Sequence, residues 1–109
     1  MRDDVFNLAL KEIKKEFKYD SVDTIFTKTQ KRRVTRGRQA FCYICHQCLI
    51  EPIYIYEFFK RKGFDMPPNL FGYNVSACKK MCARDKFFKS VVGKILEPCI
   101  QLMKYGVRQ

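Results

Sequence analysis

Residues 28–50 read KTQKRRVTRGRQAFCYICHQCLI, a basic run followed at once by an apolar one. The first twelve residues hold six lysines and arginines and no acidic side chain. The apolar side chains of the second part recur at helical spacing: Phe41, Ile44, Cys45, Cys48 and Leu49. This pattern predicts a basic loop over residues 28–38 that leads into a helix from about residue 38 to 50.

Two helices are expected before the basic run. Asp3 or Asp4 can cap a first helix of about four turns. Its apolar face comprises Phe6, Leu10, Ile13 and Phe17, with Lys11, Lys14 and Lys15 on the other side. A short second helix begins at Asp20 or Ser21 and carries Val22, Ile25 and Phe26.

Three more helices are expected in the C-terminal half of the chain. The fourth helix of the chain runs from Pro52 to about Lys62 and ends at Gly63, since proline suits a first turn and glycine a helix end. The segment Phe64–Gly72 contains two prolines and predicts an irregular connector. A fifth helix then begins at Asn74 or Ser76 and runs through Cys82.

A sixth helix starts after Asp85, a suitable N-cap residue. Its apolar side chains are Phe88, Val91, Val92 and Ile95, and Pro98 is expected to kink or end it. No segment shows the sustained alternation of a half-buried strand. We therefore expect an all-α fold, a compact bundle of about six helices forming one domain over residues 1–109, with its core at about 5–96 and a loosely defined tail at 97–109.

The composition narrows the functional classes. The formal net charge of +11 on 109 residues creates a positive field that attracts nucleic acid, acidic proteins or anionic lipid surfaces. We expect no signal peptide and no membrane span, and hence a cytoplasmic protein, in the bacterial cytoplasm or nucleoid, with no membrane partner. The six cysteines are expected to be free and buried.

The cysteines raise two metal-centre alternatives. Cys42, Cys45 and His46 spell the C-x-x-C-H signature of c-type haem attachment, but they fall within a predicted helix of a chain expected not to be exported. A zinc site would use Cys42, Cys45, Cys78 and Cys82, with His46 or Cys48 as substitutes. We expect no metal and no cofactor, because small core cysteines at helical spacing explain the same residues. The chain has one histidine and no catalytic motif, so we expect no enzyme.

The stretch VTRGRQAFCYICHQCL resembles the C-terminal DNA-binding domain of the bacterial chromosomal replication initiator (DnaA), whose pattern there is approximately VARPRQxAMYLxxxLT. Arg36, Arg38 and Gln39 match, and Gly37 replaces a proline. GYNVSACKKM stands where that family has its recognition signature, and RDKFFKSVVGKI resembles its final helix. The likeness covers about residues 5 to 96 without an ATPase module, so we expect a stand-alone accessory or regulator, with a phage origin as a further expectation.

The resemblance implies a helix-turn-helix protein that binds double-stranded DNA as a monomer or weak dimer, in replication or in transcription regulation. Its basic loop would contact phosphates and the minor groove through Lys28, Lys31, Arg32, Arg33, Arg36, Arg38 and Gln39. Its recognition helix would enter the major groove with Tyr73, Asn74, Val75, Ser76, Ala77, Lys79 and Lys80. In this interpretation Val75 and Ala77 contact thymine methyl groups.

Two alternatives remain open. The basic face could bind an acidic or nucleic-acid-binding protein, as an interaction module or inhibitor, with an aromatic cluster as the second contact. That cluster comprises Tyr54, Tyr56, Phe58, Phe59 and Phe64. Packing of these rings against the long connector explains the same residues and is favoured. The other alternative is a zinc-stabilised nucleic-acid binder.

Overall fold

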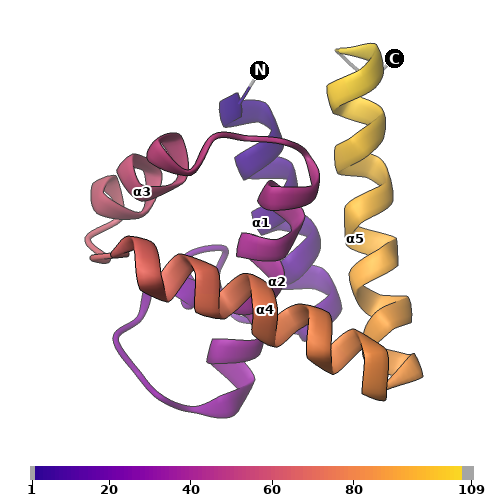
Figure 1. Ribbon diagram of the computed structural model, residues 1–109, viewed down its shortest axis with the longest axis horizontal. Helices are drawn as coiled ribbons and strands as arrows, with labels where there is room; N and C mark the ends of the chain where they lie inside the picture. The colour runs from indigo at the N-terminus through magenta and orange to yellow at the C-terminus, as the bar shows by residue number, and fades with distance from the viewer. Residues whose placement is uncertain (1, 107–109) are drawn as a thin grey trace.

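The computed structural model describes residues 2–106, and within them the chain is helical wherever apolar residues recur at spacings of three and four (Figure 1). The elements are α1 (Arg2–Phe17), a short 3-10 helix η1 (Thr24–Phe26), α2 (Arg32–Gln47), α3 (Pro52–Arg61), α4 (Pro68–Arg84) and α5 (Lys86–Tyr105). No strand occurs in this part of the chain. The predicted all-α class is confirmed, with five α-helices and one 3-10 helix instead of six helices.

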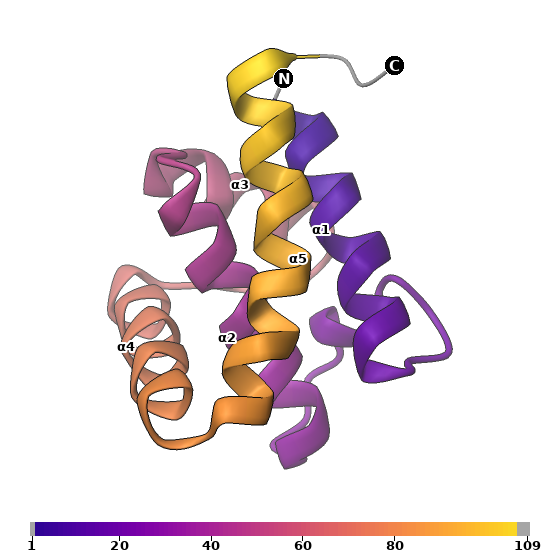
Figure 2. The same cartoon turned by 90° about the vertical axis from the view of Figure 1, so that its right-hand side faces the viewer.

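Helix α2 lies at the centre of the fold and packs against α1, α4 and α5. Figure 2 shows α5 alongside α1 in the opposite direction, so that the first turns of α1 and the last turns of α5 lie at the same end of the molecule. Helix α4 crosses in front of α2 in Figure 1. Among residues 2–106, none of the helices is both long enough and apolar enough to cross a membrane.

Aromatic rings hold α1, α2 and α3 together. Phe6 of α1 stacks on Phe58 of α3 with ring centroids 4.4 Å apart, and Phe41 of α2 meets Phe59 edge to face at 5.5 Å. Phe26 of η1 packs on Phe59 at 5.0 Å. Each such pair stabilises the fold by about 0.5–1.5 kcal/mol beyond the stabilisation from burying its apolar area. These pairs therefore attach α1, α2 and η1 to α3.

The predicted loop over residues 28–38 is wrong in its second half, because α2 begins at Arg32. The apolar face of α2 extends further toward its N-terminus than the charge pattern suggested: Val34, Gly37, Arg38, Phe41 and Cys45 are all buried. Arginine is a good helix former, so the basic residues from Arg32 onward can belong to the helix. Most of the basic run therefore lies on a rigid helix.

Gly37 allows α2 to approach the segment after α1. Its Cα faces the ring of Tyr19, and a Cβ at this position would overlap the Tyr19 hydroxyl. That ring is fixed, since it is buried and its hydroxyl donates a 2.6 Å hydrogen bond to the Arg33 carbonyl. The glycine therefore provides space for the Tyr19 ring against α2 and not a turn conformation.

We expect Gly37→Ala to lower the free energy of unfolding by about 2 kcal/mol, because the new methyl group must displace a hydrogen-bonded ring. Gly93→Ala is the matched control. Gly93 also lies inside a helix, and a Cβ there would meet nothing within 4 Å, so the substitution should stabilise by up to about 1 kcal/mol. Urea unfolding of both variants measures the difference, and equal stability of the two would contradict the close packing at Gly37.

The predicted connector Phe64–Gly72 is also wrong in its second half. Helix α4 begins at Pro68, because a proline in the first turn lacks only an N–H that the helix does not need. The buried residues Phe71, Asn74, Val75 and Cys78 form one face that packs against the core. The segment that starts at Asn74 in the prediction is therefore the middle of a helix, with no free N-terminus there.

Pro98 does not end α5, which continues to Tyr105. Ile95, Cys99 and Leu102 remain buried on either side of the proline, so packing compensates for the missing backbone hydrogen bond. The predicted loose tail at 97–109 is thus helical up to residue 105, and residues 107–109 lie outside the described part of the chain. Asp85 is confirmed as the cap of this helix, since its carboxylate accepts a hydrogen bond from the Phe88 N–H at 3.0 Å.

Candidate nucleic-acid interface

Two adjoining hollows lie between the first turns of α2 and the outer face of α4. Their volumes are about 380 and 520 Å³, and they share four residues along their common side. We call them together the α2/α4 groove. The smaller hollow is lined by Gln30, Arg32, Thr35, Arg36, Gln39, Tyr73, Ser76, Ala77, Lys80 and Arg84. The larger adds Lys28, Arg38, Phe64, Asp65, Leu70 and Asn74, among others.

The smaller hollow is strongly basic. Four cationic side chains line it, Arg32 and Arg36 from α2 and Lys80 and Arg84 from α4, and no carboxylate does. Within residues 2–106, none of the four takes part in an ion pair. Unneutralised like charges repel one another and attract counterions, so this hollow carries a favourable potential for a polyanion.

The helical repeat explains why each helix places two cations along the same hollow. Arg32 and Arg36 are four residues apart on α2, and Lys80 and Arg84 are four apart on α4, so each pair lies on one side of its helix. Helix α2 packs more extensively against α4 than against any other element. The two rows are therefore held by the core and not by flexible loops.

Arg38, predicted to contact phosphate, is instead a buried structural residue. Its side chain is 6% exposed, and it donates hydrogen bonds of 2.9 Å to the Ile25 carbonyl and 2.8 Å to the Thr27 carbonyl. The guanidinium also lies over the Phe64 ring, 4.5 Å from its centroid. Burial lowers the pKa of Arg38 from its usual value, with partial compensation by nearby groups. Its donors are used to attach the η1 segment to α2.

Asn74 and Val75, predicted to read bases, face the core. Asn74 is 4% exposed and Val75 is 7% exposed. The Asn74 amide donates to two sulfur atoms, Cys42 Sγ at 3.7 Å and Met66 Sδ at 3.8 Å. With 3.6 residues per turn, Asn74 and Val75 fall on the inner face of α4, whereas Tyr73, Ser76 and Ala77 fall on the side that lines the groove.

The remaining predicted residues divide between the groove and its surroundings. Gln39, Tyr73, Ser76, Ala77 and Lys80 line the groove with Arg32 and Arg36, and Lys28 lines its larger hollow. Lys31 and Lys79 are exposed but do not line it. Arg33 donates to the carbonyls of Phe17 and Lys18, so it holds the end of α1.

Sequence reasoning missed Arg84 as a member of the basic row. Its signal was present in the chain, since it follows Lys80 by four residues on the same helix. The predicted fifth helix ended at Cys82, so Arg84 was not placed on the same helix as Lys80. Gln30 and Thr35 also line the groove and were not among the predicted contacts.

No protein-family model, curated protein or solved structure matches the chain. The likeness to the initiator domain therefore remains an expectation based on its motif residues. One residue of the motif lies elsewhere in the structure than the family pattern implies. Gly37, which stands where that pattern has proline, lies inside α2 and not at its start.

The cysteines form no metal centre within residues 2–106, where no group of three or more metal-ligating side chains comes together. Cys42 and Cys45 are fully buried, whereas the neighbouring His46 is exposed, so a haem could not reach both thiols and the imidazole in this fold. Burial raises the pKa of the Cys42 thiol to about 12. These thiols are protonated core groups at neutral pH.

The aromatic cluster of helix α3 belongs mainly to the core. Phe58, Phe59 and Phe64 are buried, and Tyr54 and Tyr56 are partly buried. Their packing confirms the interpretation that the cluster supports the connector. It removes the exposed aromatic surface on which a second contact with a protein partner depended.

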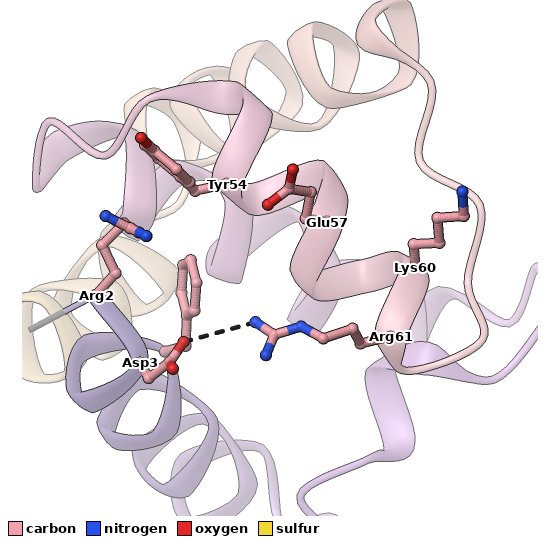
Figure 3. A pocket seen from close by; sticks show the side chains of 7 residues that line it. Arg2, Asp3, Tyr54, Glu57, Lys60 and Arg61 are labelled. Carbon is pink, nitrogen blue, oxygen red and sulfur yellow. Dashed lines mark ion pairs between the residues drawn. The ribbon is translucent and has the colours of Figure 1, made fainter.

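A separate pocket of about 590 Å³ lies between the start of α1 and α3 (Figure 3). Two of the three cations that line it are already engaged. Arg61 forms a 3.6 Å ion pair with Asp3, and Arg2 lies over the Tyr54 ring, 3.6 Å from its centroid. Glu57 adds a second carboxylate to the lining. This mixed pocket suits a polyanion far less than the α2/α4 groove.

Proposed function

We propose that the protein binds double-stranded DNA through the α2/α4 groove. The observation that carries this proposal is the set of four cations from two packed helices that line one hollow without a carboxylate: Arg32, Arg36, Lys80 and Arg84. Counterions released from phosphates by such a set supply sequence-independent affinity. Arginine adds planar, two-pronged hydrogen bonding that suits phosphate oxygens.

The rigid support of these cations favours binding to an ordered ligand. All four lie on helices, so their backbone positions are already ordered before a phosphate backbone binds. Helix α4 has 17 residues and is about 25 Å long, enough to extend across the roughly 12 Å opening of a major groove. In this arrangement α2 contacts one strand's phosphates and α4 lies against the duplex.

The corrected geometry changes the residues that would select a sequence. Ser76 is exposed on α4 and offers a hydroxyl to a base edge, and Ala77 offers a methyl group. Asn74 and Val75 take no part. The likeness to an initiator domain leads us to extend the proposal to an accessory role in replication or to transcription regulation.

Binding to a random-sequence duplex is expected to weaken steeply with salt. If four phosphates are contacted, the logarithm of the affinity should fall with the logarithm of salt concentration at a slope of about −3.6. Arg36→Gln and Lys80→Gln should each weaken binding several-fold and reduce the slope by about 1. Fluorescence anisotropy of a labelled duplex over a salt series measures both quantities.

The control is Lys11→Gln, which removes one charge from α1, on the side of the molecule away from α4 (Figure 2). Its slope should equal that of the wild type. A flat salt dependence, or an equal loss for Lys11→Gln and Lys80→Gln, would exclude the groove as a DNA site. In that case the better explanation is that the cations of the groove bind an acidic protein. A pull-down that resists nuclease treatment would identify this partner.

A further inference from the structure

Tyr73 occupies the side shared by the two hollows of the α2/α4 groove. Its side chain is 64% exposed, and it lines the larger hollow together with the apolar Leu70. Single exposed aromatics are common on protein surfaces. This one is unusual because cations lie in the hollows on both of its sides, Lys28 in one and Arg36 and Lys80 in the other.

The ring of Tyr73 is free to receive a partner. Two tyrosines of α3 are engaged by neighbouring side chains, since Tyr56 packs on Phe71 and Tyr54 carries Arg2. Within residues 2–106, Tyr73 makes neither an aromatic pair nor a cation–π contact with another side chain. A flat ring exposed to water gains free energy when another flat, apolar face covers it.

The groups around the ring are those that recognise a nucleobase. Gln30 and Gln39 line both hollows together with Tyr73, and each amide offers a donor and an acceptor. Thr35 adds a hydroxyl on the same shared side. A base that stacks on the ring would therefore have hydrogen-bonding partners for its edge, while the flanking cations hold the phosphates before and after it.

Intact duplex DNA cannot use this arrangement, because its bases are stacked on one another and expose only their edges. An unpaired base exposes its face, and aromatic side chains with a basic track are the usual means of holding one. We propose that the α2/α4 groove, besides binding duplex DNA, takes a single-stranded segment, with one unpaired base stacked on Tyr73. This rests on the proposed function and adds an unpaired segment to the DNA that the same groove binds.

The test compares a mixed-sequence single strand of about 12 nucleotides with the matching duplex, at one salt concentration, by fluorescence anisotropy. The wild type should bind both ligands, because the same cations hold the phosphates of either. Tyr73→Leu, which keeps apolar bulk but removes the flat ring, should weaken single-strand binding about tenfold and change duplex binding less than twofold. Tyr73→Phe keeps the ring and should bind the single strand within about twofold of the wild type.

A photo-crosslink provides a readout that a structural role of Tyr73 would not produce. A single strand with 5-iodouracil substitutions should crosslink to Tyr73 in the wild type, as located by mass spectrometry. The inference is overturned if Tyr73→Leu affects both ligands equally, or if the crosslink falls elsewhere. If the wild type does not bind the duplex, the proposed function itself fails, and the two failures are thereby distinguished.

Discussion

Raising the pH from about 8 to about 10.5 is expected to lower the free energy of unfolding by about 4 kcal/mol, through the thiols of Cys42 and Cys99 alone. Burial raises the pKa of each thiol to about 12 from an ordinary value of 9.0. Above the ordinary value, the unfolded chain releases protons that the folded chain retains. This contribution to stability is thus complete below the unfolded pKa and is lost as the pH rises toward 12.

Cys45 and Cys78 shift in the same direction, because burial raises the pKa of each thiol, and they make the decline steeper. Urea unfolding at a series of pH values, with a reductant present, measures the effect. Cys42→Ala lacks one titrating thiol, so its loss between the two pH values should be smaller by about 2 kcal/mol. Constant stability of the wild type up to pH 10.5 would show that the thiols are accessible to water in the folded state.

Arg38→Ala is expected to lower the free energy of unfolding by about 3–4 kcal/mol. The substitution removes two hydrogen bonds from a charged donor, to the carbonyls of Ile25 and Thr27, and leaves the buried Ile25 carbonyl without this partner. It also removes the contact of the guanidinium with the Phe64 ring. Because η1 is attached to α2 through these bonds, the loss should extend to the whole cooperative unit.

Arg36→Ala is the matched control for this substitution. It changes the same residue type on the same helix, but Arg36 is only partly buried and lines the groove. We expect it to cost less than about 1 kcal/mol of stability while weakening DNA binding. Arg38→Lys should recover only part of the lost stability, because an ammonium lacks the planar fork that reaches two carbonyls. A free energy of unfolding for Arg38→Ala equal to that of the wild type would contradict the structural role of Arg38.

Elements whose signals are local were predicted well. Helices α1 and α3 follow directly from their apolar spacing, and the cap at Asp85 was identified from its residue type. Helix boundaries that depend on packing were not. The start of α2 at Arg32 and the continuation of α5 through Pro98 both need burial against other helices, which offsets an unfavourable or ambiguous local sequence.

The candidate site was predicted in its chemistry but not in all its members. Arg36, Ser76 and Lys80 were expected to face a ligand, and they line the groove. Arg38 and Asn74 were placed with them because charge and polarity usually indicate exposure. The structure buries both, since each finds hydrogen-bond acceptors inside the fold. Arg84 was missed because the predicted helix was two residues too short.

Two properties of this protein follow from its chain alone. Apolar residues at helical spacing make it all-α, and a surplus of eleven positive charges gives it a field that attracts polyanions, because both depend only on composition and short-range order. The choice of which cations can meet a ligand depends on how α2 packs on α4. That packing turns Arg38 and Asn74 inward and leaves Arg36, Tyr73 and Lys80 along one groove, since burial is a property of contacts between segments far apart in the sequence.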